Sequence, residues 1–181
     1  MLVGGRSSRM GRDKALLPFR GAVLAEAVAR AVEDAAGTVT LIGDPGVYAG
    51  LGFPVIPDLH PGEGPLGGIV GALAHTAADW NLVAACDMPE LSAEFLRGLL
   101  DAACVADRDA MVPCGPSGRL EPLCAVYHRR SHQALQTAFA AGIRKVTAAF
   151  SELHIAAWPV PGIAVFQNVN TPEDWADYAA K

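Results

Sequence analysis

Short apolar runs alternate along this sequence with longer runs whose apolar residues recur at helical spacing. The predicted strands are TVTLIG, FPVI, NLVAAC, DAMVP, PLCAVYH and HIAAWPV, which begin at residues 38, 53, 81, 109, 122 and 154. The helical patterns cover residues 22–36, 69–78, 92–104, 129–142 and 171–181. This alternation predicts a three-layer α/β fold, with a mostly parallel central sheet and helices on both faces.

Residues typical of helix ends support these ranges. Gly37 and Gly142 stand where two of the helices would end. Ser92 and Thr171 stand in N-cap positions, and Pro172 would occupy the first position of the last helix.

Length, charge and cysteine usage narrow the class of protein. The 181 residues fit a single domain, 1–181, and a formal net charge of -5 argues against a nucleic-acid partner. We expect the four cysteines, which form no CxxC pair, to be small buried residues in a reducing compartment. With no signal peptide and no apolar stretch of about 18 residues, we expect a cytoplasmic protein with no membrane partner.

The densest chemistry lies at the start of the chain, in LVGGRSSRMGRDK. Leu2 and Val3 would end a strand, and Gly4 and Gly5 would turn the chain so that backbone amides can approach an anion. Four cations follow, at Arg6, Arg9, Arg12 and Lys14. The segment is neither a Walker A loop nor a dinucleotide fingerprint, yet its residues favour phosphate binding over a solvated surface loop.

Two aspartates also follow predicted strands. Asp87 comes directly after NLVAAC and suits Mg²⁺, which prefers oxygen ligands, although a turn or helix-cap aspartate is the alternative. Asp58 follows FPVI and precedes the glycine-rich segment GEGPLGG. That segment suits close approach to a base or ribose, and a plain turn into a helix explains it equally well. Because ligands bind at the carboxyl ends of parallel strands, we expect these groups at one edge of the sheet.

These motifs together resemble the molybdenum cofactor guanylyltransferase (MobA-type) family of nucleotidyltransferases. The matching segments run in order through the chain: LVGGRSSRMGRDKALLP, PDLHPGEGPLGG, AACDMPEL, EPLCAVYH and FQNVNTPEDW. The resemblance implies a Rossmann-like nucleotidyltransferase fold. It also implies transfer of GMP from GTP to the phosphate of Mo-molybdopterin, with Mg²⁺ as cofactor and with handover contacts to other molybdenum-cofactor synthesis proteins.

The resemblance also implies roles for individual residues. The nucleotide contacts would be Leu2, Val3, Gly4, Gly5 and Asp58. Catalysis would rest on Lys14 and Arg9 at the phosphates and on Asp87 as the Mg²⁺ ligand. Asn168 and Asn170 would face the acceptor. An asparagine that some members carry after the second strand has no clear counterpart in TLIGDP.

Two alternatives to this function stay open at the level of sequence. One is a molybdenum cofactor cytidylyltransferase, which would use a related glycine-rich loop, and the other is a non-catalytic protein that binds a nucleotide or a pterin.

The apolar run at the start of the sequence is shorter than a usual strand. Only Met1, Leu2 and Val3 precede the glycines, so we expect a strand fragment at Leu2–Val3 whose beginning lies upstream of Met1.

Overall fold

The computed structural model describes residues 1–4, 13–169, 174–175 and 178. Six strands belong to the central region: β3 (Leu41–Ile42), β4 (Val55–Ile56), β5 (Trp80–Ala84), β6 (Ala110–Cys114), β7 (Cys124–His128) and β8 (Ile155–Pro159). A small hairpin pairs β1 (Pro18–Phe19) with β2 (Ala22–Val23). The α-helices whose bounds lie within the described residues are α1 (Leu24–Ala36), α2 (Pro45–Tyr48), α3 (Pro65–Ala74), α4 (Ala93–Cys104), α5 (His132–Ala140) and α6 (Val146–Ala149), and Asp174, Trp175 and Tyr178 are also helical.

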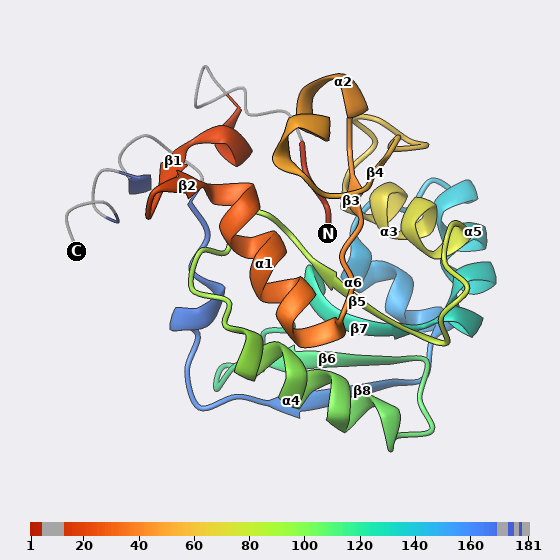
Figure 1. The fold of residues 1–181 in the computed structure, drawn as a ribbon. Coiled ribbons are helices and arrows are strands. Elements are labelled where there is room, and N and C mark those ends of the chain that lie inside the picture. Colours follow the sequence, from red (N-terminus) through yellow and green to blue (C-terminus); the bar gives the residue numbers. More distant parts are fainter. Residues whose placement is uncertain (5–12, 170–173, 176–177, 179–181) are drawn as a thin grey trace.

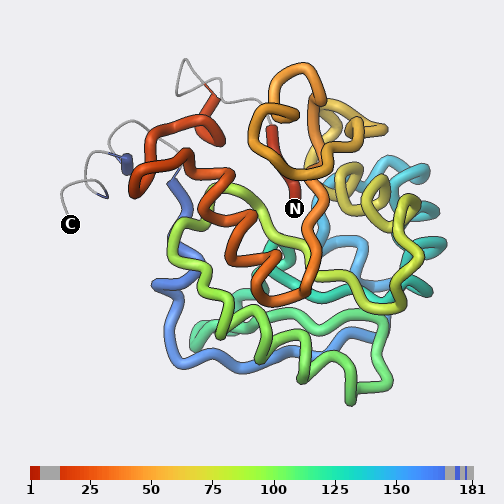
Figure 2. The backbone as a smooth tube through the Cα atoms, viewed as in Figure 1, coloured from red at the N-terminus to blue at the C-terminus, as the bar shows by residue number. Residues whose placement is uncertain are grey.

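The first residues of the chain join two groups of strands into one surface. Leu2 forms parallel bridges to Ile42 on one side and to Ala85 on the other. The expected strand fragment at the start of the chain is therefore confirmed at Leu2, and Figure 2 shows these red residues beside the orange β3. The existence of a longer strand upstream of Met1 stays a prediction. The strand order is β4, β3, the Leu2 segment, β5, β7, β6 and β8.

Most neighbouring strands run parallel, as predicted, but β7 does not. β3 is parallel to β4 and β6 to β8, whereas β7 is antiparallel to both β5 and β6. The reason is local: residues 115–123, which join β6 to β7, contain no helix. A parallel return needs a longer crossover, so the short connection makes a reversed neighbour.

Helices cover both faces of the sheet, which confirms the three-layer prediction (Figure 1). On one face, Val83 and Ala125 pack in a cluster with Leu66 of α3 and Leu135 of α5. On the other face, Ala84 packs with side chains of α1, while Met111 and Val126 meet α4. Adjacent strand residues thus point to opposite faces, and both faces are apolar, as expected for a buried central sheet.

Several predicted helix ends are confirmed. Ser92 caps α4, because its hydroxyl accepts a hydrogen bond from the Phe95 amide at 3.2 Å. Gly37 ends α1 with a φ of +77°, a left-handed conformation that glycine adopts without strain. The predicted cap Thr171 lies outside the described residues.

Other predicted boundaries were wrong. Helix α1 begins at Leu24 rather than at residue 22, because Ala22 and Val23 pair with β1. Helix α3 begins at Pro65 rather than at residue 69, so the PLGG sequence is helical. Proline is favoured at the first position of a helix, and this is the signal that a loop reading of GPLGG overlooked. Among the described helices, none has the length and apolar character needed to cross a membrane.

Candidate active site

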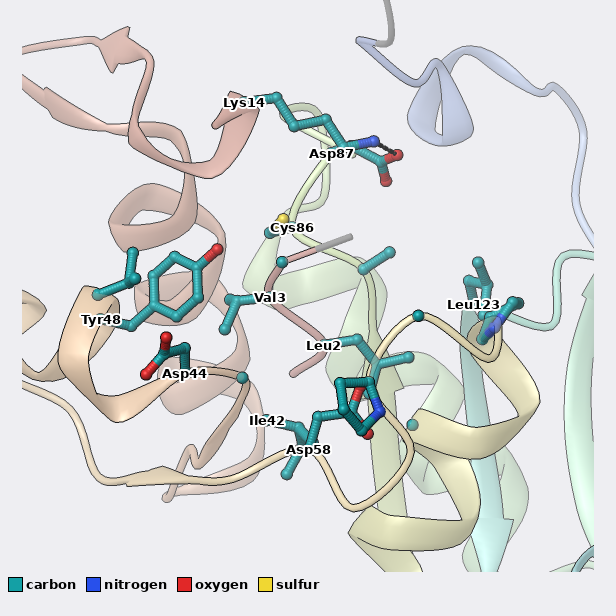
Figure 3. A pocket seen from close by; sticks show the side chains of 18 of the residues that line it. Leu2, Val3, Lys14, Ile42, Asp44, Tyr48, Asp58, Cys86, Asp87 and Leu123 are labelled. Carbon is teal, nitrogen blue, oxygen red and sulfur yellow. Dashed lines mark hydrogen bonds and ion pairs between the residues drawn. The ribbon is translucent and has the colours of Figure 1, made fainter. Parts of the chain in front are cut away.

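The carboxyl ends of the central strands meet around one pocket of about 620 Å³ (Figure 3). Its lining comes from six segments: residues 2–4, the turn at Lys14, the β3–α2 corner, the loop before α3 with the first turn of that helix, the end of β5 and the residue before β7. The residues are Leu2, Val3, Gly4, Lys14, Ile42, Gly43, Asp44, Val47, Tyr48, Asp58, Pro61, Gly62, Gly64, Pro65, Gly68, Ala85, Cys86, Asp87 and Leu123. The structure thus brings together most of the residues predicted to bind nucleotide.

Residues 2–4 enter the pocket from the middle of the sheet. The Leu2 amide donates to the Ala84 carbonyl at 2.8 Å, and the Val3 amide donates to the Ile42 carbonyl at 3.0 Å. Immediately after this paired segment, Gly4 has a φ of +84°, which lets the chain turn away from the sheet. The predicted turn at the end of the first strand is therefore confirmed at Gly4, while Gly5 lies outside the described residues.

Lys14 and Asp87 face each other at one end of the pocket (Figure 3). The Lys14 Nζ atom lies 2.6 Å from Asp87 Oδ2, and their side chains are only 21% and 11% exposed. Lys14 begins a short 3-10 turn, η1 (Lys14–Leu16), whose N-cap is Asp13. Two groups that lie 73 positions apart in the sequence thus form one partly buried ion pair.

The second carboxylate oxygen of Asp87 has an unusual environment. Asp87 Oδ1 is buried and has no hydrogen-bond partner among the described residues. A buried, unpaired carboxylate oxygen is costly, so it is a natural position for a cation ligand. The described residues contain no cluster of three or more His, Cys, Asp or Glu side chains that could hold a metal. Asp87 therefore suits an ion such as Mg²⁺, which takes one or two carboxylates and completes its shell with water and phosphate oxygens.

Asp58 and the loop that follows it form the opposite wall of the pocket. Asp58 Oδ1 accepts a hydrogen bond from the His60 amide at 2.9 Å, which turns the chain after β4. Gly64 has a φ of +90° and directs the chain into α3. From outside the pocket, the Arg144 guanidinium binds Glu63 Oε2 at 2.6 Å and holds this loop to the segment after α5.

The β3–α2 corner is a part of the site in which the sequence analysis assigned no residue. Gly43 and Asp44 line the pocket directly after β3, and Tyr48 lines it from α2. An added Cβ on Gly43 would lie 2.7 Å from Val3 Cγ2 and 2.9 Å from a ring carbon of Tyr48, so no side chain fits there. The glycine that follows the apolar run TVTLI was the available signal, because close backbone approach at a strand end requires it.

Of the two asparagines predicted to face the acceptor, only Asn168 belongs to the described residues. The amide of Val169 donates to the Asp87 carbonyl at 3.0 Å, which attaches the C-terminal segment to the end of β5. Asn168 is next to this contact but does not line the pocket, and its buried Oδ1 has no partner among the described residues. Asn170 and Arg9 lie outside the described residues.

Cysteine burial is less uniform than predicted. Cys86 and Cys124 are buried, Cys114 is half-buried, and Cys104 is exposed at the end of α4. Burial raises the pKa of the Cys86 thiol to about 12, with the neighbouring Asp87 charge acting in the same direction. A thiol that stays protonated is a poor nucleophile, so Cys86 forms an inert wall of the pocket.

Known proteins share this architecture along nearly the whole chain. The molybdenum cofactor guanylyltransferase of Xanthomonas euvesicatoria pv. vesicatoria is 38% identical, over 97% of this chain and 90% of the relative. The probable molybdenum cofactor guanylyltransferase of Deinococcus radiodurans is 35% identical, over 98% of this chain and 91% of the relative. The crystal structure of molybdopterin-guanine dinucleotide biosynthesis protein A from Archaeoglobus fulgidus has a TM-score of 0.81 and 31% identity, and the match covers 97% of this chain and 93% of that chain.

These likenesses confirm both the predicted resemblance and the nucleotidyltransferase fold. A family model also matches, the MobA-like NTP transferase domain, over residues 1–155. This matched range contains the glycine turn, the Lys14–Asp87 pair and the β3–α2 corner. The chain therefore belongs to the MobA-like NTP transferase family.

Proposed function

We propose that this protein transfers GMP from GTP to the phosphate of Mo-molybdopterin, giving the molybdopterin guanine dinucleotide cofactor and pyrophosphate. The observation that carries the proposal is the grouping of Gly4, the Lys14–Asp87 pair and Asp58 around one pocket at the carboxyl edge of the sheet. The names of the relatives from Xanthomonas and Deinococcus support guanylyl transfer as the specific reaction.

In the proposed reaction, an oxygen of the acceptor phosphate attacks the α-phosphorus of GTP. The bond from the α-phosphorus to the oxygen bridging the α- and β-phosphates breaks, and pyrophosphate leaves with the electron pair of that bond. The step needs no covalent intermediate on the protein, in agreement with the protonated thiol of Cys86. Catalysis then depends on positioning the two substrates and on neutralising the charge that develops on the phosphates.

Lys14 supplies charge at the phosphates in this proposal. In the structure its ammonium lies 2.6 Å from Asp87 Oδ2 and neutralises that carboxylate. When the nucleotide binds, the ammonium exchanges this carboxylate for phosphate oxygens and stabilises the departing pyrophosphate. Arg9 would assist at the same phosphates, and the backbone of Leu2, Val3, Gly4 and Gly5 would follow the nucleotide, with Asp58 at the opposite wall.

Asp87 would hold Mg²⁺ through the oxygen that has no hydrogen-bond partner among the described residues. A bound Mg²⁺ supplies Lewis-acid stabilisation of the phosphate charge. Asp87 also fixes the C-terminal segment through its carbonyl, which accepts from the Val169 amide. This contact supports acceptor-side roles for the neighbouring Asn168 and Asn170.

The test is a measurement of pyrophosphate release with purified protein, Mg²⁺ and molybdopterin, comparing GTP with CTP. We expect release only when GTP and the acceptor are both present, and none when a chelator removes the metal. Release with CTP instead would identify a cytidylyltransferase. Tight binding of GTP or pterin with no release from any combination would identify a non-catalytic binding protein.

The setting of the reaction is part of the same proposal. We expect a cytoplasmic protein of one domain that meets other molybdenum-cofactor synthesis proteins at handover of its labile acceptor. Neither nucleic acid nor a membrane has a role in this proposal.

A further inference from the structure

Tyr48 of α2 lies beside two residues that come before and after the phosphate-binding loop predicted from the sequence, Gly4 and Asp13. Its hydroxyl donates a hydrogen bond to Asp13 Oδ2. The same hydroxyl oxygen lies 3.3 Å from the position that a Cβ on Gly4 would occupy. Tyr48 is only 3% exposed, so the ring is packed among its neighbours in the wall of the pocket.

The ring fits because glycines flank it. Gly43 leaves room for ring carbon Cε2, which would otherwise lie 2.9 Å from a side chain at that position. Gly4 leaves room for the hydroxyl in the same way. In Figure 3 the Tyr48 hydroxyl points towards the side of the pocket where Lys14 and Asp87 meet.

Asp13 connects Tyr48 to the short turn that carries Lys14. One carboxylate oxygen of Asp13 accepts from Tyr48, while the other accepts from the Ala15 amide at 3.0 Å and caps the 3-10 turn. The turn is closed by the Leu17 amide, which donates to the Lys14 carbonyl at 3.2 Å. A carboxylate bound on both oxygens has little freedom to rotate, so the start of the turn that carries Lys14 is fixed relative to α2.

We propose that Tyr48 is a positioning residue for phosphate binding. Through Asp13 it sets where the Lys14 ammonium stands relative to the backbone of Gly4, so that both act on one phosphate chain. This inference rests on the proposed function, because it assumes that Lys14 and Gly4 bind the phosphates of a nucleotide. The hydroxyl is the essential atom, and the ring alone supplies packing.

The experiment measures binding of two probes, GTP with Mg²⁺ and inorganic pyrophosphate with Mg²⁺, by titration calorimetry. The variants are Tyr48→Phe, Asp13→Asn and the double variant. Tyr127→Phe is the matched control, because Tyr127 is also fully buried and its hydroxyl donates to the Pro122 carbonyl at 2.9 Å, but it does not line the pocket. Thermal unfolding of every variant is measured alongside.

We expect Tyr48→Phe to weaken binding of both probes by about tenfold, which is the effect of losing a hydrogen bond to a charged group. The double variant should bind the probes no more weakly than whichever single variant binds them more weakly. The reason is that both substitutions break the same hydrogen bond, the one between Tyr48 and Asp13. In turnover assays, Tyr48→Phe should raise the KM for GTP and leave the KM for the acceptor unchanged. Tyr127→Phe should lower the unfolding temperature and leave both affinities unchanged.

The inference is overturned if Tyr48→Phe binds both probes as the wild-type protein does. It is also overturned if the losses from the two single variants add, or if Tyr127→Phe weakens binding equally. A wild-type chain that binds pyrophosphate but releases none from GTP would refute the proposed function, while the Tyr48 result would still decide the positioning role. A wild-type chain that binds neither probe would refute both.

Discussion

The two halves of the sheet are built differently. In the half that contains the pocket, β3 and β4 are two residues long and the first segment pairs only around Leu2. In the other half, β5, β6, β7 and β8 each have five residues. The antiparallel pairing of β5 with β7 extends from Trp80 opposite His128 to Ala84 opposite Cys124.

The difference in strand length between the two halves matches two separate requirements, a rigid scaffold and a backbone that can approach a ligand. Long paired strands satisfy their backbone groups within the sheet and provide a rigid scaffold. Short strands that end in Gly4 and Gly43 leave backbone free to approach a ligand closely. We therefore expect changes in the short-strand half to affect nucleotide binding first, and changes in the long-strand half to affect stability first.

The largest effect should come from the ion pair at the pocket. Lys14→Ala or Asp87→Ala should reduce guanylyl transfer by about 10³-fold, because each removes a charge that acts on the phosphates, and should leave the fold intact. Steady-state pyrophosphate release and circular dichroism measure these two properties. Lys145→Ala is the matched control, since Lys145 is exposed and does not line the pocket. Near-normal turnover in either variant would contradict the assignment.

A second comparison uses two glycines. Gly43→Ala should lower the free energy of unfolding by about 1–3 kcal/mol, because the new methyl group would lie 2.9 Å from the Val3 carbonyl oxygen. It should also weaken GTP binding, since Val3 and Tyr48 both line the pocket. Urea unfolding and GTP titration measure the two effects.

Gly98→Ala in α4 provides the contrast. An added Cβ there meets only Trp158, at an ordinary 3.7 Å, and alanine is favoured over glycine in a helix by roughly 0.5–1 kcal/mol. This variant should be as stable as the wild type or more so, with unchanged GTP affinity. Equal behaviour of the two glycine variants would remove the distinction between the halves.

A third prediction concerns alkaline pH and compares a thiol that lines the pocket, Cys86, with one inside the long-strand half, Cys124. Burial raises the pKa of Cys86 to about 12 and raises that of Cys124 on β7 as well. Above pH 9 the unfolded chain loses these protons while the folded chain keeps them. The free energy of unfolding should therefore fall by roughly 1 kcal/mol for each thiol between pH 9 and 10.

Urea unfolding at pH 8 and pH 10 measures this loss. Cys86→Ala and Cys124→Ala should each flatten the decline, whereas Cys104→Ala should not, because Cys104 is exposed. An unchanged decline in both buried-site variants would show that other groups cause it.

The smallest effect should come from the contact that holds the loop before α3. Glu63→Gln removes an exposed ion pair with Arg144, and such pairs contribute about 0–1 kcal/mol. The KM for GTP should rise by only about two- to fivefold, because Arg144 still donates to the Phe139 carbonyl at 2.8 Å. Glu26→Gln on α1, which breaks the exposed pair with Arg30, should leave this KM unchanged.

Much of this architecture was predictable from the sequence because periodicity and strand-end chemistry are local signals. Asp87, Asp58 and Gly4 each follow an apolar run, and the rule that ligands bind at the carboxyl ends of strands was enough to group them. The helix caps at Ser92 and Gly37 were likewise predictable, because serine and glycine are typical residues at the start and at the end of a helix.

The remaining features either leave no periodic signal in the sequence or depend on contacts between distant segments. The reversal of β7 follows from the helix-free connection 115–123, which leaves no periodic signal. Tyr48 appeared as one aromatic residue in a short apolar stretch, and only the fold brings it to Asp13, 35 positions away. The unpaired oxygen of Asp87 is visible only when its surroundings are known.

The antiparallel direction of β7 has a consequence for redesign. Because β7 starts where β5 ends, the Leu123 carbonyl accepts from the Ala85 amide at 2.8 Å, and the connection from β6 arrives beside the pocket. That connection carries no helix and lies outside the paired part of β7. Its exposed tip, residues 116–118, is thus an exchangeable module, whose length and sequence can be replaced by grafting while the contacts of Leu120 and Leu123 and the strand pairing are retained.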